Sequence, residues 1–230
     1  MKIDEKLKNY YNEWWENPKD IRNTVFETLN SYIRTRIPPG RGRKALDIGS
    51  GKGRIVSYLL EKGYEVTAIE FNEKFALDLK NKYPQIKVIS DDIRKIKLNQ
   101  CFNVITCIEL IQNLKMQETQ KLLGELAIHT DRLFINISNS NSFHGKWVKM
   151  MKFQADFVFD YEPNSFDNMI NQAGFIISHR KGIGLITPVS LFKGFKGVIV
   201  PVCIAKIVNN LDSVAPRICH LYYVEAKKPM

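Results

Sequence analysis

Cysteine is scarce in this 230-residue chain, and long apolar runs are missing. No C-x-x-C pair occurs among the four cysteines, so their spacing predicts neither a zinc site nor a disulfide framework. No apolar run reaches the roughly 20 residues that a membrane-spanning helix needs. The N-terminal stretch is charged and aromatic, unlike the apolar segment of a signal peptide. From these absences we expect a cytoplasmic protein.

The chain has an excess of basic side chains but lacks a nucleic-acid-binding signature. Lys and Arg number 34 against 24 Asp and Glu, which gives a net charge of +10. Such a charge raises the question of a nucleic-acid or anionic-membrane partner. However, the basic residues are spread along the chain and do not alternate with aromatic residues as in RNA-binding motifs. The distribution therefore disfavours a nucleic acid as the partner.

Hydrophobic periodicity divides the chain into a helical leader and an alternating core. Residues 1–42 are predicted to be helices followed by a Pro- and Gly-rich loop. In residues 43–181 short apolar strands alternate with helices, which predicts a parallel sheet covered on both faces. Residues 182–217 form an apolar insert, and residues 218–230 hold a last strand. We expect a single domain made of these four segments.

The pattern also sets the bounds of the individual elements. The expected strands are 44–48, 66–70, 87–90, 102–108, 133–137, 175–178 and 222–226. The expected helices of the core are 54–61, 73–82, 117–129 and 164–173. The segment that follows the fifth strand, from residue 138 to 145, is predicted to be a loop.

A strand, a glycine-rich turn and a helix follow one another between residues 45 and 61. Gly49, Gly51 and Gly53 form G-x-G-x-G, and Asp47 precedes the first glycine by two residues. Glycines let the backbone turn tightly and approach a ligand without a Cβ in the way. The spacing differs from the dinucleotide motif G-x-G-x-x-G, and the Asp47 carboxylate would repel a pyrophosphate but attract an ammonium. For the glycines alone, a tight turn without a ligand is the alternative.

Further acids follow at the ends of the next three predicted strands. Glu70 ends the second strand, where a carboxylate can accept both ribose hydroxyls of a nucleoside. After the third strand, Asp91 or Asp92 can bind an adenine amino group and Ile93 can cover the ring. Either acid could equally cap a helix. Glu109 ends the fourth strand, so the acids are expected to share one edge of the sheet.

These residues, between about 44 and 114, resemble the small-molecule branch of the class I S-adenosylmethionine-dependent methyltransferases. The run Gln172-Ala173-Gly174-Phe175 extends the likeness loosely. The resemblance implies a Rossmann-like, doubly wound, mostly parallel seven-stranded sheet with an antiparallel last strand, and S-adenosylmethionine as cofactor. It assigns Asp47, Gly49 and Gly51 to the methionine moiety, Glu70 to the ribose, Asp92 and Ile93 to the adenine, and Ile108 to a backbone contact. The predicted cofactor set is completed by Phe71 and Tyr11.

The chain departs from the family pattern at two places. Asn103 stands where the family usually has Asp. The run that starts at Glu109 resembles the E-x-x-E-H stretch of ubiquinone-type O-methyltransferases, which binds a divalent metal in some of those enzymes. Here Gln112 and Asn113 replace the second acid and the histidine. Since neutral amides are poor substitutes for such ligands, we expect no catalytic metal.

A hydroxyl acceptor would need a general base, and two residues are candidates. His144 follows the fifth strand, at the edge where ligands bind in open α/β sheets, and a histidine there could titrate near neutrality. The alternative is a histidine bonded to backbone. Glu109 is the second candidate, although it could instead orient the acceptor. Tyr11 and Trp14 share a helical face and are expected either to close over the site as a lid or to pack on the sheet.

The apolar insert 182–217 bears on the acceptor. Its Val, Ile, Leu and Phe side chains need cover from water, so we predict that it walls a pocket for a small, apolar or lipid-like acceptor. Peripheral membrane contact and a homodimer interface are the alternatives. We expect O- or N-methylation by in-line displacement. An RNA or protein methyltransferase and a non-catalytic S-adenosylmethionine-binding protein are the competing hypotheses, and no N/D-P-P-Y/F signature of base-amino methylation follows the fourth strand.

Overall fold

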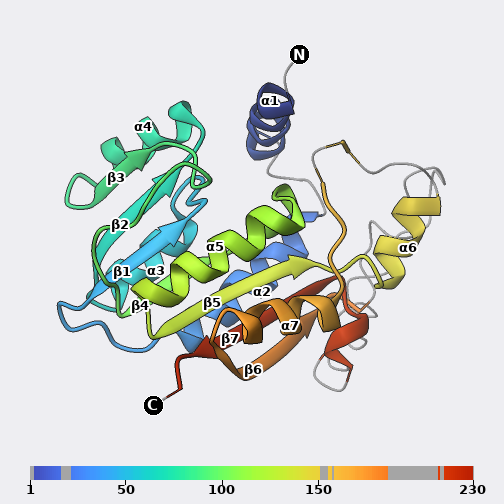
Figure 1. Ribbon diagram of the computed structural model, residues 1–230. Helices are drawn as coiled ribbons and strands as arrows, with labels where there is room; N and C mark the ends of the chain where they lie inside the picture. Colours follow the sequence, from blue (N-terminus) through green and yellow to red (C-terminus); the bar gives the residue numbers. More distant parts are fainter. Residues whose placement is uncertain are drawn as a thin grey trace.

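The computed structural model describes residues 3–16, 22–150, 155–156, 158–185, 212 and 215–229. Within these ranges seven strands form one sheet in the order β3-β2-β1-β4-β5-β7-β6 (Figure 1). The strands are β1 (Lys44–Ile48), β2 (Glu65–Glu70), β3 (Lys87–Ser90), β4 (Val104–Cys107), β5 (Arg132–Ser138), β6 (Ile176–Ile183) and β7 (Leu221–Lys227). The helices used below are α1 (Ile3–Glu16), α2 (Arg22–Arg36), α3 (Arg54–Glu61), α4 (Glu73–Lys82), α5 (Met116–His129), α6 (Phe143–Met150) and α7 (Pro163–Gln172), with the short 3₁₀ helices η1 (Ile111–Asn113) and η4 (Pro216–Ile218).

The sheet is doubly wound and mostly parallel. β1 pairs in parallel with both β2 and β4, so the strand order reverses between β1 and β4. β7 lies antiparallel to both β5 and β6, which confirms the predicted antiparallel last strand. In such sheets ligands bind in the crevice at the carboxyl ends of the strands where the order reverses. The topology therefore directs attention to the carboxyl ends of β1 and β4.

Apolar side chains cover both faces of the sheet. On one face α5 and α7 contribute Leu123, Leu126 and Phe166 to a core that includes Ile105 of β4. On the other face α2 and α3 contribute side chains such as Leu29 to a second core. Figure 1 shows α5 and α7 in front of the sheet and α2 and α3 behind it. The predicted parallel sheet with helices on both sides is confirmed.

Most of the predicted bounds agree with the structure, and three do not. The strand predicted at 102–108 is shorter, because only Val104–Cys107 pairs within the sheet. The strand predicted at 175–178 extends to Ile183, and its side chains alternate between exposed and half-buried as at a sheet edge. The loop predicted after β5 contains helix α6. That helix starts where the Ser142 hydroxyl accepts a hydrogen bond from the Gly145 amide at 2.9 Å, as in a serine N-cap.

Most of the insert 182–217 lies outside the described residues, and so does the side chain of Trp14. The predicted role of the insert in the acceptor pocket, and the alternatives of membrane or dimer contact, thus stay predictions. No helix in the described ranges is long and apolar enough to cross a bilayer.

Candidate functional site

The turn after β1 depends on glycine for its backbone conformation. Gly49 and Gly51 have φ values of 73° and 53°, in the left-handed region that glycine adopts without strain. A Cβ on Gly49 would lie 3.4 Å from Leu110 Cδ1, an ordinary contact, so conformation rather than crowding requires glycine there. Gly53 also has a left-handed φ, of 79°, and a Cβ there would in addition lie 2.6 Å from the Leu79 side chain of α4. All three glycines thus allow the turn, and the third also lets α3 and α4 pack.

Asp47 is a buried acid with one oxygen still available. Its Oδ1 accepts a hydrogen bond from Thr106 Oγ1 of β4 at 2.6 Å. Its Oδ2 is buried without a hydrogen-bond partner among the described residues. Burial raises the pKa of Asp47 to about 6, against the lowering effect of its hydrogen bonds. A buried carboxylate oxygen without a donor suits a cationic ligand group, such as an ammonium, that would restore the ionised form.

Glu70 ties the glycine turn to the start of α4. Its Oε2 accepts from Gly51 N at 2.7 Å and its Oε1 accepts from Asn72 N at 2.8 Å. Burial raises its pKa, while these backbone hydrogen bonds act in the opposite direction. Because a carboxylate oxygen can accept more than one hydrogen bond, both oxygens can still receive ligand hydroxyls. Glu70 therefore organises the turn and keeps lone pairs that could accept ligand hydroxyls.

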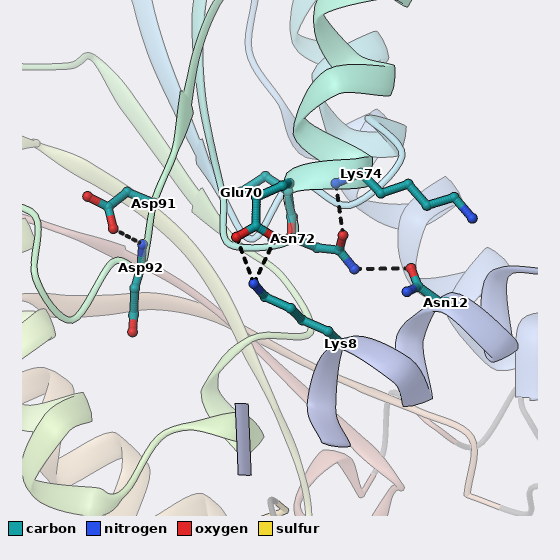
Figure 2. A network of polar contacts seen from close by, with 8 residues as sticks. Lys8, Asn12, Glu70, Asn72, Lys74, Asp91 and Asp92 are labelled. Atoms are coloured by element: carbon teal, nitrogen blue, oxygen red, sulfur yellow. Dashed lines mark hydrogen bonds and ion pairs between the residues drawn. The ribbon is translucent and has the colours of Figure 1, made fainter. Parts of the chain in front are cut away.

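Asp92 forms a compact turn after β3. Arg94 donates to it from its backbone N to Oδ1 at 2.9 Å, and from Nε to Oδ1 at 3.0 Å and to Oδ2 at 2.8 Å. Burial alone would raise the pKa of Asp92, but these bonds and the Arg94 charge hold it below its usual range. Its neighbour Asp91 accepts the Asp92 amide at 2.7 Å, as Figure 2 shows. Asp92 thus stabilises this turn and also lines the pocket, and so does the next residue, Ile93.

One pocket brings the predicted cofactor residues together at the carboxyl edge of the sheet. All nine line it: Tyr11, Asp47, Gly49, Gly51, Glu70, Phe71, Asp92, Ile93 and Ile108. The lining continues past Ile108 to Glu109, Leu110, Asn113 and Leu114, and it also includes Phe26 and Asn30 of α2. Phe26 and Asn30 were not predicted as site residues, because no motif in the sequence around α2 relates that helix to the ends of the strands.

Glu109 stands directly after β4 in an unusual backbone conformation. Its φ is 60°, in the left-handed region that non-glycine residues rarely adopt. Its amide donates to Asn136 Oδ1 at 2.8 Å, and its carboxylate accepts from Asn136 Nδ2. Gln112 Nε2 donates to the Glu109 carbonyl at 2.9 Å and to its Oε2 at 3.2 Å. Burial raises the pKa of Glu109 to about 7, although both amide groups and Arg54 act to lower it.

His144, the other predicted base, lies elsewhere. It is on α6, where its ring centroid is 4.1 Å from that of His220, and it does not line the pocket. Burial, and then the charge of His144, hold the pKa of His220 well below its ordinary value. The structure thus brings Glu109, and not His144, to the predicted cofactor residues.

Helix α1 lies across the mouth of the pocket. Lys8 pairs with Glu73 at 2.7 Å, and Asn72 donates to Asn12 at 3.1 Å, so α1 is held to the start of α4 (Figure 2). At the other end of the pocket, Asn113 Nδ2 donates to the Tyr11 hydroxyl at 2.8 Å. Burial raises the pKa of Tyr11, whose hydroxyl is enclosed. These contacts give the predicted lid a definite attachment on both sides of the site.

The amides that replace the family's metal-binding positions have other partners here. Gln112 binds Glu109, and Asn113 binds Tyr11. In the described part of the chain no three His, Cys, Asp or Glu side chains are grouped so that they could hold a metal ion. The Asn103 departure is structural, because its Oδ1 accepts the Lys44 amide at 3.0 Å where β1 begins.

Comparison with known proteins gives matches to methyltransferases. Residues 45–131 match the family model described as a methyltransferase domain. The ubiquinone biosynthesis O-methyltransferase of Rickettsia canadensis is 22% identical over 78% of this chain and 84% of its own length. The ribosomal RNA small subunit methyltransferase A of Chlorobium chlorochromatii is 29% identical over 37% of this chain, which covers 33% of that relative's length. This chain likewise covers 57% of an uncharacterized methyltransferase of Alkaliphilus oremlandii.

Solved structures share the fold. Magnesium protoporphyrin IX methyltransferase from Synechocystis PCC 6803 with bound S-adenosylmethionine superposes with a TM-score of 0.65 at 12% identity, over 100% of this chain and 98% of that one. A glycopeptide N-methyltransferase complexed with sinefungin gives a TM-score of 0.56 at 14% identity, over 87% and 85% of the two chains. At these identities the likeness is one of fold.

Proposed function

We propose that the chain is a class I S-adenosylmethionine-dependent methyltransferase that methylates a small, at least partly apolar acceptor; the match of residues 45–131 to a methyltransferase domain and the shared fold support this. The observation that carries this proposal is the shared pocket, in which the predicted cofactor residues lie beside a carboxylate and apolar side chains. A small-molecule acceptor also agrees with the Rickettsia relative, whose name gives it a role in ubiquinone biosynthesis.

The cofactor end of the pocket fits S-adenosylmethionine by the chemistry of its donors and acceptors. Asp47 Oδ2, buried without a partner among the described residues, would accept the cofactor's ammonium. Glu70 would accept the ribose hydroxyls, and the exposed backbone of Gly49 and Gly51 would let the methionine moiety approach. Asp92 and Ile93 would border the adenine.

The acceptor end is mainly apolar. We take the acceptor end to be the part of the pocket near Glu109; apolar side chains of Phe26, Leu110 and Leu114 and the buried amide of Asn30 line the same pocket. Pockets of this composition bind ligands largely through apolar contact, with a few polar groups that fix orientation. Two of the lining cations, Lys8 and Arg94, are already paired with acids, which gives little support for a phosphate backbone. An apolar small molecule therefore suits this end better than RNA.

In the proposed reaction the chain supplies position, a dry site and a proton acceptor. S-adenosylmethionine, when bound, supplies a methyl group on a sulfonium that becomes neutral on transfer. The pocket, whose lining includes residues of α1, would position the two reactants and limit the access of water to them. With a pKa of about 7, Glu109 is substantially ionised at neutral pH and can take the proton of a hydroxyl acceptor.

Two measurements test this function. Calorimetry should show that S-adenosylhomocysteine binds the wild-type protein. Incubation with methyl-labelled S-adenosylmethionine and a fractionated cell extract should then label a small molecule that partitions into organic solvent, which mass spectrometry can identify. Label confined to RNA or protein would contradict the proposed acceptor, and binding without any transfer would favour a non-catalytic S-adenosylmethionine-binding protein.

A further inference from the structure

Glu109 occupies a backbone conformation that its side chain does not favour. Its φ of 60° lies in the left-handed region, where a residue with a Cβ is disfavoured. Conformations of this kind persist only where the surroundings hold them, and they are concentrated at functional sites. The groups that hydrogen-bond Glu109 are therefore the ones that keep this conformation at the end of β4.

Asn136 contacts both the main chain and the side chain of Glu109. Its Oδ1 accepts the Glu109 amide at 2.8 Å, and its Nδ2 donates to the Glu109 carboxylate. Asn136 itself is fully buried within β5, on the strand next to β4. A buried amide that bonds both the main chain and the carboxylate of one residue fixes the turn and the direction of the carboxylate.

Gln112 binds the other oxygen of the same carboxylate. Its Nε2 donates both to the Glu109 carbonyl and to Oε2. Its own Oε1, however, is buried without a hydrogen-bond partner among the described residues. A buried polar atom without a hydrogen-bond partner is unfavourable. The Gln112 side chain thus gives Glu109 two hydrogen bonds from Nε2 while its Oε1 loses the bond it would make to water.

We propose that Asn136 and Gln112 are positioning residues that present the Glu109 carboxylate to a hydroxyl group of the acceptor. This inference rests on the proposed function. The acceptor oxygen forms a bond to the methyl carbon as the carbon–sulfur bond breaks. The electron pair of that bond goes to sulfur, and the hydroxyl proton goes to Glu109. Asn136 binds Oε1 and Gln112 binds Oε2, so the two amides fix the carboxylate through both oxygens, and each oxygen keeps a lone pair that can accept the proton.

Two other groups share the surroundings of Glu109 and enter any pH dependence. Arg54, from the first turn of α3, lowers the pKa of Glu109 by its charge. Tyr11, from α1, lies near enough that the Glu109 charge contributes to raising the tyrosine pKa. Both residues line the same pocket, and neither is changed in the test variants.

The test is a carbon-13 NMR titration of the Glu109 carboxyl in protein with S-adenosylhomocysteine, assigned by its loss in Glu109→Gln. We expect Asn136→Ala and Gln112→Leu each to shift the Glu109 midpoint upward by about one pH unit, as follows from removing a donor to the ionised carboxylate. Asn103→Ala is the matched control, because it removes a strand-start amide far from Glu109 and should leave the midpoint unchanged.

Gln112→Leu decides the question if Asn136→Ala does not fold, since it also removes the buried Oε1 atom that has no described partner. The rate of label transfer to the extracted acceptor, measured against pH, should show the same upward shift in both variants. Unchanged midpoints and pH profiles in variants that bind S-adenosylhomocysteine normally would overturn the positioning role. Failure of the wild type to bind S-adenosylhomocysteine would instead refute the proposed function.

Discussion

The two ends of the pocket hold their acids in different ways. At the cofactor end, Asp47 lies in β1 and Glu70 is the last residue of β2, and their carboxylates bond to backbone amides or to a neighbouring hydroxyl. At the acceptor end, Glu109 is held by side-chain amides from β5 and η1. The first arrangement uses groups close to the glycine turn and the paired strand, whereas the second uses side chains from two other elements. We infer that binding and proton transfer are separable, and that mutations at the two ends should have different effects.

The largest effect is expected at the glycine turn. Gly49→Val puts a β-branched side chain at a φ of 73°, where valine is strained, and it displaces the backbone that would approach the cofactor. Binding of S-adenosylhomocysteine should fall below detection in calorimetry while circular dichroism shows a folded protein. A variant that binds with wild-type affinity would show that the turn is only structural.

At the acceptor end, Glu109→Gln should lower label transfer by about 10²–10⁴-fold, the usual contribution of a general base. In the wild type only the ionised carboxylate accepts a proton, so the rate should rise with pH through about 7. The variant should lose this rise. A variant that keeps both the rate and the pH profile would assign Glu109 to orientation or structure instead.

A smaller effect is expected from Glu70→Gln. Both carboxylate oxygens accept backbone amides, so the substitution places an NH₂ group opposite one amide hydrogen. We expect S-adenosylhomocysteine to bind about 1.5–3 kcal/mol more weakly, as for a lost hydrogen bond to a charged group. An affinity change of only a few tenths of a kcal/mol would mean that a ligand does not use Glu70.

Removal of metal should have the smallest effect. The amides at positions 112 and 113 are engaged with Glu109 and Tyr11, and amides are weak ligands in any case. Label transfer should therefore be unchanged by a chelator. Activity that is lost on chelation and restored by magnesium would contradict this part of the comparison.

The same contrast explains how much could be predicted from the sequence. The strands, the glycine turn and the strand-end acids depend on local patterns, and all nine predicted cofactor residues line one pocket. Asn136 lies 27 residues from Glu109, and Tyr11 lies 102 residues from Asn113, so only the folded chain brings them together. The sequence predicted that His144 lies in a loop after β5. In the structure His144 lies instead in helix α6, where its ring contacts that of His220.

The central claim is that Asp47 serves binding and Glu109 serves transfer. Its most direct test is the affinity for S-adenosylhomocysteine of Asp47→Asn beside that of Glu109→Gln. Asp47→Asn keeps an oxygen for Thr106 but removes the charge that would attract the ammonium, so its affinity should fall at least about tenfold, as for a charge-assisted hydrogen bond. Glu109→Gln should bind within about twofold of the wild type, the scatter of a substitution away from the ligand. Equal losses in both variants, or none in Asp47→Asn, would contradict the account.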